Sequence, residues 1–151
     1  MTKHLRLMFV AMLTIACSLV GKAAEGDTYK LVTDASELKS GDIVVIASKD
    51  KAVAMGAPND KKEKYQPVTG IKITDDVLAY KEGFTELLLE GEAGKWYFKY
   101  GNGYIYANST TFSTDLSFDT SKKKSANISI SNGNASIGFD IFANSKYLSY
   151  S

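Results

Sequence analysis

A short β-branched run near the start of the chain constrains the fold more than any other feature. Residues 43–46 read Ile-Val-Val-Ile, and residues of this type favour strands that are buried. A polar turn follows, and residues 53–56 (Val-Ala-Met-Gly) have the composition of a returning strand. The sequence therefore predicts a buried hairpin here, around which the rest of the chain is arranged.

The residues just before this run predict one short helix. Asp34 and Glu37 have the spacing of a capping box, in which each side chain accepts a hydrogen bond from the backbone N–H of the other residue. Gly41 is of the residue type that commonly ends a helix, because glycine adopts a positive φ without steric cost. We therefore expect one short helix near residues 34–40.

Most of the remaining chain consists of short apolar or alternating segments separated by turn residues. The clearest hairpin joins the aromatic segments 96–100 and 104–107 through a Gly-Asn-Gly turn, and Asn132-Gly133 is a strong type I′ turn signal. These patterns predict an all-β protein. Further strands are expected at residues 71–73, 77–79, 84–89, 116–118, 126–131, 135–142 and 147–150, with charged loops at 58–67 and 121–125.

A faint internal repeat favours one architecture. Residues 43–56, 97–109 and 139–151 each read as an apolar strand, a polar turn and a short strand of small and aromatic residues. A threefold β-trefoil barrel produces such a rhythm, as does any barrel of hairpins. We expect a single barrel, β-trefoil-like rather than a plain barrel or a sandwich.

The first residues read as an export signal. A positive start is followed by an uncharged apolar region, residues 7–20, and Gly21-Lys22-Ala23 offers a small-x-small cleavage site. The sequence thus predicts a signal peptide at residues 1–23 and a single all-β domain at residues 24–151. The alternative is a lipoprotein with a lipid anchor at Cys17. Both interpretations predict a secreted, periplasmic or cell-surface protein.

Removing residues 1–23 would change the chemical inventory sharply. The single His4, Cys17 and Arg6 all lie in that segment, which leaves 15 lysines against 17 acidic residues, a net charge of −2. A mildly acidic chain without arginine lacks the features that favour nucleic acid, so we expect no nucleic-acid partner. A membrane partner is expected only if Cys17 is lipidated.

The same inventory argues against catalysis. Without His or Cys, the processed chain excludes Ser-His-Asp and Cys-His arrangements and ordinary zinc ligand sets. A carboxylate pair for glycoside hydrolysis needs only two Asp or Glu, but Glu90 and Glu92 flank a turn glycine and Asp75-Asp76 reads as a turn. We expect no enzyme, no cofactor and no metal site.

Carbohydrate binding has a physical case, because sugar C–H faces stack on aromatic rings and sugar hydroxyls bond to polar side chains. Trp96, Phe98 and Tyr100 alternate onto one face, which we expect to be core. For the remaining tyrosines, packing within the sheet is the competing interpretation. The candidate ligand-binding residues, beside two corresponding turns, are Asn102, Tyr104, Tyr106, Asn108, Asn144 and Tyr147.

Several stretches resemble an all-β module of secreted and surface proteins from Bacteroidetes. The resemblance rests on LVTDASELKSGDIVVIAS at residues 31–48, AVAMGA at 52–57, FTELLLEG at 84–91 and GYIYA at 103–107, with the late hairpin of 132–150. These motifs are structural glycines and apolar runs.

The resemblance implies a lectin-like accessory role. Such modules occur alone or joined to endonuclease/exonuclease/phosphatase-type domains, and they continue past the position of Tyr150 with two further strands. By that resemblance, we expect either a chain truncated at its C-terminus, with an unpaired strand edge there, or a barrel that closes in another way.

Two functions of different classes follow. The first is an exported, non-catalytic, carbohydrate-binding (lectin-like) module whose partner is a glycan or cell-surface component. The alternative is a structural or adhesive envelope protein that self-associates by β-edge pairing. A lectin would bind one glycan class as a monomer, whereas an edge-pairing protein would change size with concentration.

Overall fold

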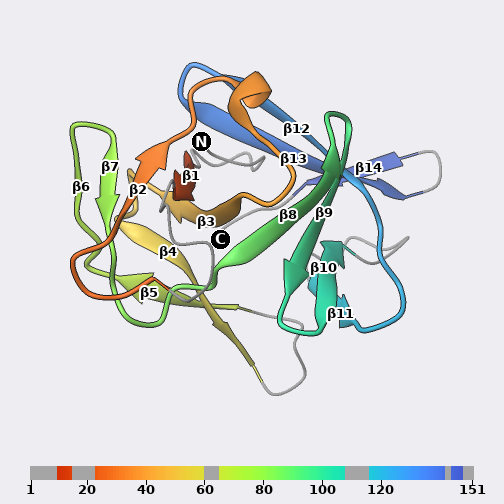
Figure 1. Ribbon diagram of the computed structural model, residues 1–151, viewed down its shortest axis with the longest axis horizontal. Helices are drawn as coiled ribbons and strands as arrows, with labels where there is room; N and C mark the ends of the chain where they lie inside the picture. Colours follow the sequence, from red (N-terminus) through yellow and green to blue (C-terminus); the bar gives the residue numbers. More distant parts are fainter. Residues whose placement is uncertain (1–9, 15–22, 60–64, 108–115, 142–143, 148–151) are drawn as a thin grey trace.

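The chain folds into an all-β structure, seen in a computed structural model that describes residues 10–14, 23–59, 65–107, 116–141 and 144–147. The 14 strands of the described residues pair in a single curled sheet that forms half of a barrel (Figure 1). The strands are β1 (Val10–Thr14), β2 (Thr28–Leu31), β3 (Ile43–Ser48), β4 (Val53–Pro58), β5 (Tyr65–Thr69), β6 (Ile73–Thr74), β7 (Val77–Ala79), β8 (Leu87–Glu92), β9 (Lys95–Tyr100), β10 (Gly103–Ala107), β11 (Leu116–Asp119), β12 (Ala126–Ser131), β13 (Asn134–Ile141) and β14 (Asn144–Tyr147).

Strand β3 is the centre of this sheet, as the β-branched run predicts. Its residues from Val44 to Ser48 are all buried, so both faces of the strand are covered. Its first residues pair with β8, its last residues pair with β4, and its other edge pairs with β1 along five positions. Such complete enclosure explains why β3 carries an uninterrupted apolar run rather than an alternating one.

Strand β1 lies inside the segment that the sequence predicts to be a signal peptide. It runs antiparallel between β3 and β2, with Val10 opposite Ala47 and Met12 opposite both Val45 and Leu31. The position of the cleavage site stays a prediction, and Cys17 lies outside the described residues.

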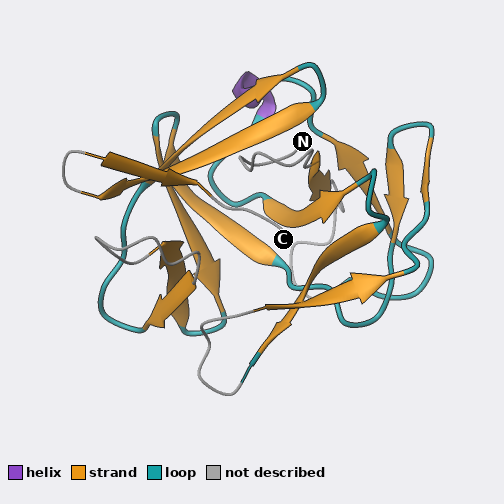
Figure 2. Cartoon of the chain, turned by 180° about the vertical axis from the view of Figure 1, so that it is seen from behind, coloured by secondary structure: helices purple, strands orange, loops and turns teal. Residues whose placement is uncertain are grey.

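The helix is shorter than the sequence predicts. It is a 3₁₀ helix of three residues, Ala35–Glu37, and it is the only helical element among the described residues (Figure 2). The capping box is confirmed, because Asp34 accepts from the backbone of Ser36 at 2.8 Å and Glu37 accepts from the backbone of Asp34 at 3.0 Å. Gly41, at φ 100°, lies in a later turn and does not end the helix.

Two turns have the predicted geometry. Asn132 and Gly133 have φ angles of 50° and 74°, as a type I′ turn requires, and join β12 to β13. In the hairpin of β9 and β10, Gly101 has a φ of 57° at the first central position. A third hairpin, β6–β7, turns through Asp75 and Asp76 at φ 51° and 61°. These two-residue turns fix the pairing register of the adjoining strands and hence the face on which each side chain lies.

Three boundaries differ from the sequence-based expectation. The predicted charged loop 58–67 contains the start of an edge strand, β5, in which Pro67 lies opposite Met55. An edge strand tolerates proline because a residue on its outer side needs no N–H to bond to a neighbouring strand. Strand β8 continues through Glu92, so the turn falls at residues 93–94 rather than at Gly91. The last described strand, β14, begins at Asn144 rather than at residue 147, and residues 148–150 of the expected strand lie outside the described residues.

The three repeated segments all contain an antiparallel hairpin. These hairpins are β3–β4, β9–β10 and β13–β14. They branch from different parts of the sheet, because β4 and β5 extend from one end of β3, while β10 and β11 extend from one end of β9 (Figure 1). Each of the three repeated segments thus contains a hairpin, while a threefold arrangement stays a prediction.

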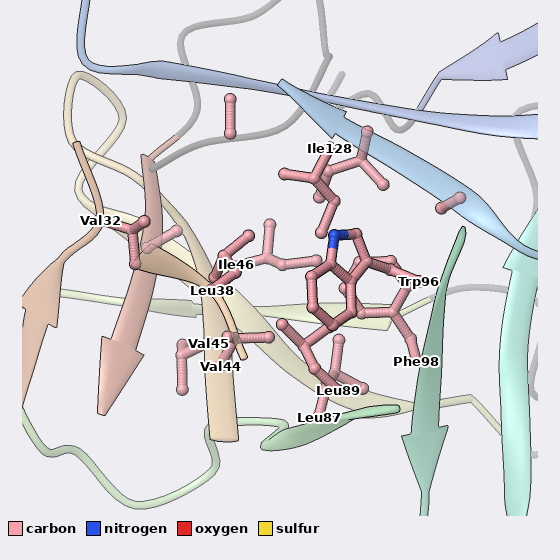
Figure 3. Packing of buried hydrophobic residues seen from close by; sticks show 14 of the residues in the cluster. Val32, Leu38, Val44, Val45, Ile46, Leu87, Leu89, Trp96, Phe98 and Ile128 are labelled. Carbon is pink, nitrogen blue, oxygen red and sulfur yellow. The ribbon is translucent and has the colours of Figure 1, made fainter. Parts of the chain in front are cut away.

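The core fills the concave side of the curled sheet with aromatic and aliphatic side chains. Trp96 and Phe98 point from β9 toward Leu87 and Leu89 of β8, and Ile128 lies on the other side of the indole (Figure 3). All five are buried. Phe98 also contacts Phe139 of β13, with ring centroids 5.9 Å apart. The expectation that Trp96 and Phe98 belong to the core is confirmed.

A buried hydroxyl joins the segment before β8 to strand β4. Thr85 is 2 % exposed, and its hydroxyl donates to the carbonyl of Gly56 over 2.6 Å. Its backbone N–H donates to the carbonyl of Met55 over 2.8 Å.

Within the described residues, no helix is long and apolar enough to cross a membrane.

Gly91 is a position where only glycine fits. Its φ is 110°, and a Cβ built there would lie 2.2 Å from the carbonyl oxygen of Lys95 on the paired strand. The β8–β9 ladder therefore keeps its close approach only because this side chain is absent.

Gly91→Ala is expected to lower the free energy of unfolding by about 2 kcal/mol or more, because it adds a backbone clash to an unfavourable φ. Gly94→Ala is the matched control, since Gly94 has a φ of 84° but open space around its Cβ position. Urea unfolding of both variants measures the difference. Equal midpoints for the two variants would contradict this explanation.

Candidate functional site

Strand alternation divides β9 between the core and the opposite face of the sheet. Trp96 and Phe98 are buried, whereas Tyr97 and Lys99 are half-buried and point away from the core. Successive side chains of a strand point to opposite faces, so Tyr97 and Lys99 must lie together on the outer face of the sheet. This face is where polar and aromatic side chains gather.

The strand register places partners from β8 and β10 beside these two residues. Glu90 of β8 lies opposite Tyr97, and Lys99 lies opposite Tyr104 of β10. Lys123, from the loop between β11 and β12, reaches over the two tyrosine rings. We call these five residues, Glu90, Tyr97, Lys99, Tyr104 and Lys123, the tyrosine–lysine face.

The Glu90 carboxylate connects the three strands of the face. The Tyr104 hydroxyl donates to Glu90 Oε2 over 2.6 Å, and Lys99 Nζ donates to Glu90 Oε1 over 3.4 Å. Each carboxylate oxygen thus has its own partner, one on β10 and one on β9. The ion pair is partly exposed, so its main effect is to fix side-chain positions rather than to add much stability.

The two tyrosine rings form an edge-to-face pair. Their centroids lie 6.4 Å apart at an interplanar angle of 75°. Lys123 Nζ lies 4.4 Å from the centroid of Tyr97 and 5.1 Å from that of Tyr104, within the range of cation–π attraction. An ammonium group therefore covers both rings in this structure.

The loop that carries Lys123 is held by Asp119 at the end of β11. The Asp119 carboxylate accepts from the backbone of Ser121 over 2.8 Å, from the Ser121 hydroxyl over 2.9 Å and from the backbone of Lys122 over 2.9 Å. The bond from the Ser121 backbone is the main cause that lowers the pKa of Asp119 below its ordinary value. Asp119 therefore stays charged and keeps the lysine run in place near neutral pH.

Hydrogen bonding also sets the charges within the face. The bond from the Tyr104 hydroxyl, followed by that from Lys99, lowers the pKa of Glu90 below its ordinary value. The same bond to Glu90 raises the pKa of Tyr104. Near neutral pH Glu90 is thus a carboxylate and Tyr104 keeps a neutral hydroxyl.

The groups of this face can offer a ligand both apolar contact and hydrogen bonds. Aromatic rings offer apolar surface, and the carboxylate and ammonium groups accept and donate hydrogen bonds around them. The described residues contain no cluster of three or more His, Cys, Asp or Glu that could hold a metal ion.

The structure places only part of the sequence-predicted site in this face. Tyr104 belongs to it, whereas Asn102 is exposed in the β9–β10 turn. Tyr106 is on the same side of β10 as Tyr104 but is 5 % exposed, with Lys124 Nζ 5.5 Å from its ring centroid. The packing interpretation of Tyr106 is thus confirmed.

The remaining predicted residues are only partly described. Asn144 lies opposite Ile141 and Tyr147 lies opposite Gly138 in the β13–β14 hairpin, but their side chains are outside the description. Asn108 lies outside the described residues altogether.

Sequence reasoning did not select Glu90, Tyr97, Lys99 or Lys123. A signal for Tyr97 and Lys99 was present, because placing Trp96 and Phe98 in the core assigns their neighbours to the outer face. No local pattern indicates that Lys123 returns over β9 and β10.

Comparisons of the chain with protein-family models, curated proteins and solved structures find no match.

The bond between Tyr104 and Glu90 has a consequence for titration. Tyr104→Phe removes the main cause of the lowered pKa of Glu90, so that pKa should rise toward the ordinary value of glutamate. NMR titration of the Glu90 carboxyl carbon measures this shift.

Because the folded pKa of Glu90 is lowered, its contribution to stability is present above the unfolded pKa and is lost as pH falls through the folded pKa.

Tyr97→Phe is the matched control for this titration, because it removes a hydroxyl from the same face without removing the bond to Glu90. An unchanged Glu90 pKa in Tyr104→Phe would show that the tyrosine does not control it.

Proposed function

We propose that this protein is an exported, non-catalytic carbohydrate-binding module and that the tyrosine–lysine face is its binding surface. The observation that carries the proposal is the pair formed by Tyr97 and Tyr104, half-buried on the outer face of the sheet and bordered by one carboxylate and two ammonium groups.

The chemistry of this face matches that of a sugar ring. The C–H side of a pyranose is apolar and stacks on tyrosine, while its hydroxyls both donate and accept hydrogen bonds. Glu90 offers acceptor oxygens, and Lys99 and Lys123 offer donors. A glycan that enters would displace the Lys123 ammonium from the rings and use it as a hydrogen-bond donor at the rim.

Preorganisation supports the same proposal. Glu90, Lys99 and Tyr104 are already joined by hydrogen bonds, and all three stand on paired strands rather than on loops. Side chains that are fixed before binding lose little conformational entropy when a ligand arrives. A face with side chains fixed in this way can therefore recognise a sugar at a small entropic cost.

The proposal includes the architecture and location that the sequence predicts. The three hairpins β3–β4, β9–β10 and β13–β14 support a trefoil-like arrangement, in which one unit is repeated around an axis. The apolar segment after Lys3 and Arg6 supports secretion to the cell envelope, and the resemblance to lectin-like modules of Bacteroidetes supports an extracellular glycan as the ligand.

One observation favours the alternative, a structural or adhesive protein that assembles by edge pairing. Within the described part of the chain, β5, β6, β11 and β14 each pair on one side only. Open strand edges of this kind can recruit another chain.

A glycan-array screen of the exported protein tests the carbohydrate proposal. Selective binding to one glycan class is expected, and Tyr97→Ala and Tyr104→Ala should each weaken binding about fivefold or more, the equivalent of about 1 kcal/mol per stacking contact. Circular dichroism in the aromatic region checks that each variant keeps its packing.

Lysine variants provide a matched pair for the same screen. Lys123→Gln should alter glycan affinity, whereas Lys122→Gln should not, because only Lys123 contacts the rings of Tyr97 and Tyr104. A folded protein that binds no glycan but grows in size with concentration would refute the carbohydrate proposal and establish the edge-pairing alternative.

A further inference from the structure

Strand β1 lies between β2 and β3, which do not pair with each other. β1 is antiparallel to β3 and antiparallel to β2, so β2 and β3 run parallel with one strand position between them. The pairing extends over five positions on β3, from Ile43 to Ala47, and over Lys30 and Leu31 on β2.

Both processing routes that the sequence predicts would empty this position. Cleavage after Ala23 removes Val10–Thr14, and cleavage before Cys17 for lipid attachment removes the same residues. The exported protein would therefore lose the strand that pairs with the centre of its own sheet, whichever route it follows.

We propose that the gap between β2 and β3 in the exported protein is a binding site for a β-strand donated by another polypeptide. The donated strand is extended and uncharged, spans about five residues as β1 does, and runs antiparallel to both β2 and β3. This inference rests on the export step of the proposed function and is independent of glycan binding.

The energetic case begins with the backbone of β3. Loss of β1 would leave the N–H and C=O groups along that edge without a ladder partner, next to side chains that are buried on both faces of the strand. A buried and unpaired backbone group is costly, and nearly all such groups in folded proteins are satisfied. A strand that enters the gap satisfies both edges at once.

The walls of the gap define the chemistry of the incoming strand. Val44, Val45, Ile46 and Ala47 of β3 are buried, as are Tyr29 and Leu31 of β2. A partner strand must therefore be apolar on both faces, and proline is excluded where its missing N–H would interrupt a ladder. Val-Ala-Met-Leu-Thr, the sequence that occupies the gap before processing, meets these conditions.

The described part of the chain supplies no replacement of its own. Outside the strands it consists of the 3₁₀ helix, turns and short loops. The donor in this proposal is another polypeptide, which makes this site an acceptor for strand donation.

A synthetic peptide tests the acceptor. The full chain is produced with export, and mass spectrometry identifies the new N-terminus. The probe contains residues 9–15 (Phe-Val-Ala-Met-Leu-Thr-Ile) between terminal lysines that keep it soluble. The control probe carries Met12→Pro. Hydrogen exchange should show at least tenfold slower exchange of β3 amides between Ile43 and Ala47 with the first probe and no change with the second.

The full chain retained in the cytosol is the matched protein control. Its own β1 occupies the gap, so it should bind neither peptide. Specific protection in the processed protein alone supports the proposal.

Three results would overturn it: a processed monomer whose β3 amides are already protected without peptide, a processed dimer with the same protection, or an exported chain that retains residues 10–14. The first shows that this chain fills the gap, the second that another copy does, and the third that the gap never opens. Glycan binding is measured separately, so its failure is distinguishable from each of these.

Discussion

The rest of the structure depends on one constraint: the backbone N–H and C=O groups of β3 must form hydrogen bonds with strands on both of its edges. β3 is buried on both faces, so water cannot replace a missing ladder. β1, β4 and β8 supply its partners, and β8 in turn supports β9 and the aromatic core. The pairing of β3 with β8 and of β8 with β9 therefore sets the position of the tyrosine–lysine face, since β8 and β9 carry three of its five residues.

Much of the fold could be predicted from local residues, because the signals are short-range. The β-branched run identified β3, Asn132-Gly133 identified a type I′ turn, and Asp34 with Glu37 identified the capping box. The boundaries that differ depend on long-range pairing. Gly91 resembled a turn residue, but β9 pairs with β8 through that glycine and extends the strand to Glu92.

The candidate site was less predictable than the fold. Tyr104 was selected from the hairpin pattern. The alternation of apolar and polar residues along β9 also places Tyr97 on the outer face. Lys123 comes from a loop held by Asp119 and reaches the rings across the sheet, so its contact depends on tertiary geometry alone. Asn102 shows the opposite case, because a polar residue that suits a turn is exposed there without joining the face.

The place of β1 has a consequence for the order of events during synthesis. Its partners on β3 lie far along the chain, and pairings between distant segments form slowly because loop closure must come first. The proposed signal peptide would therefore remain accessible while the chain is still short. Slow folding of the sheet is then compatible with the early recognition that export requires.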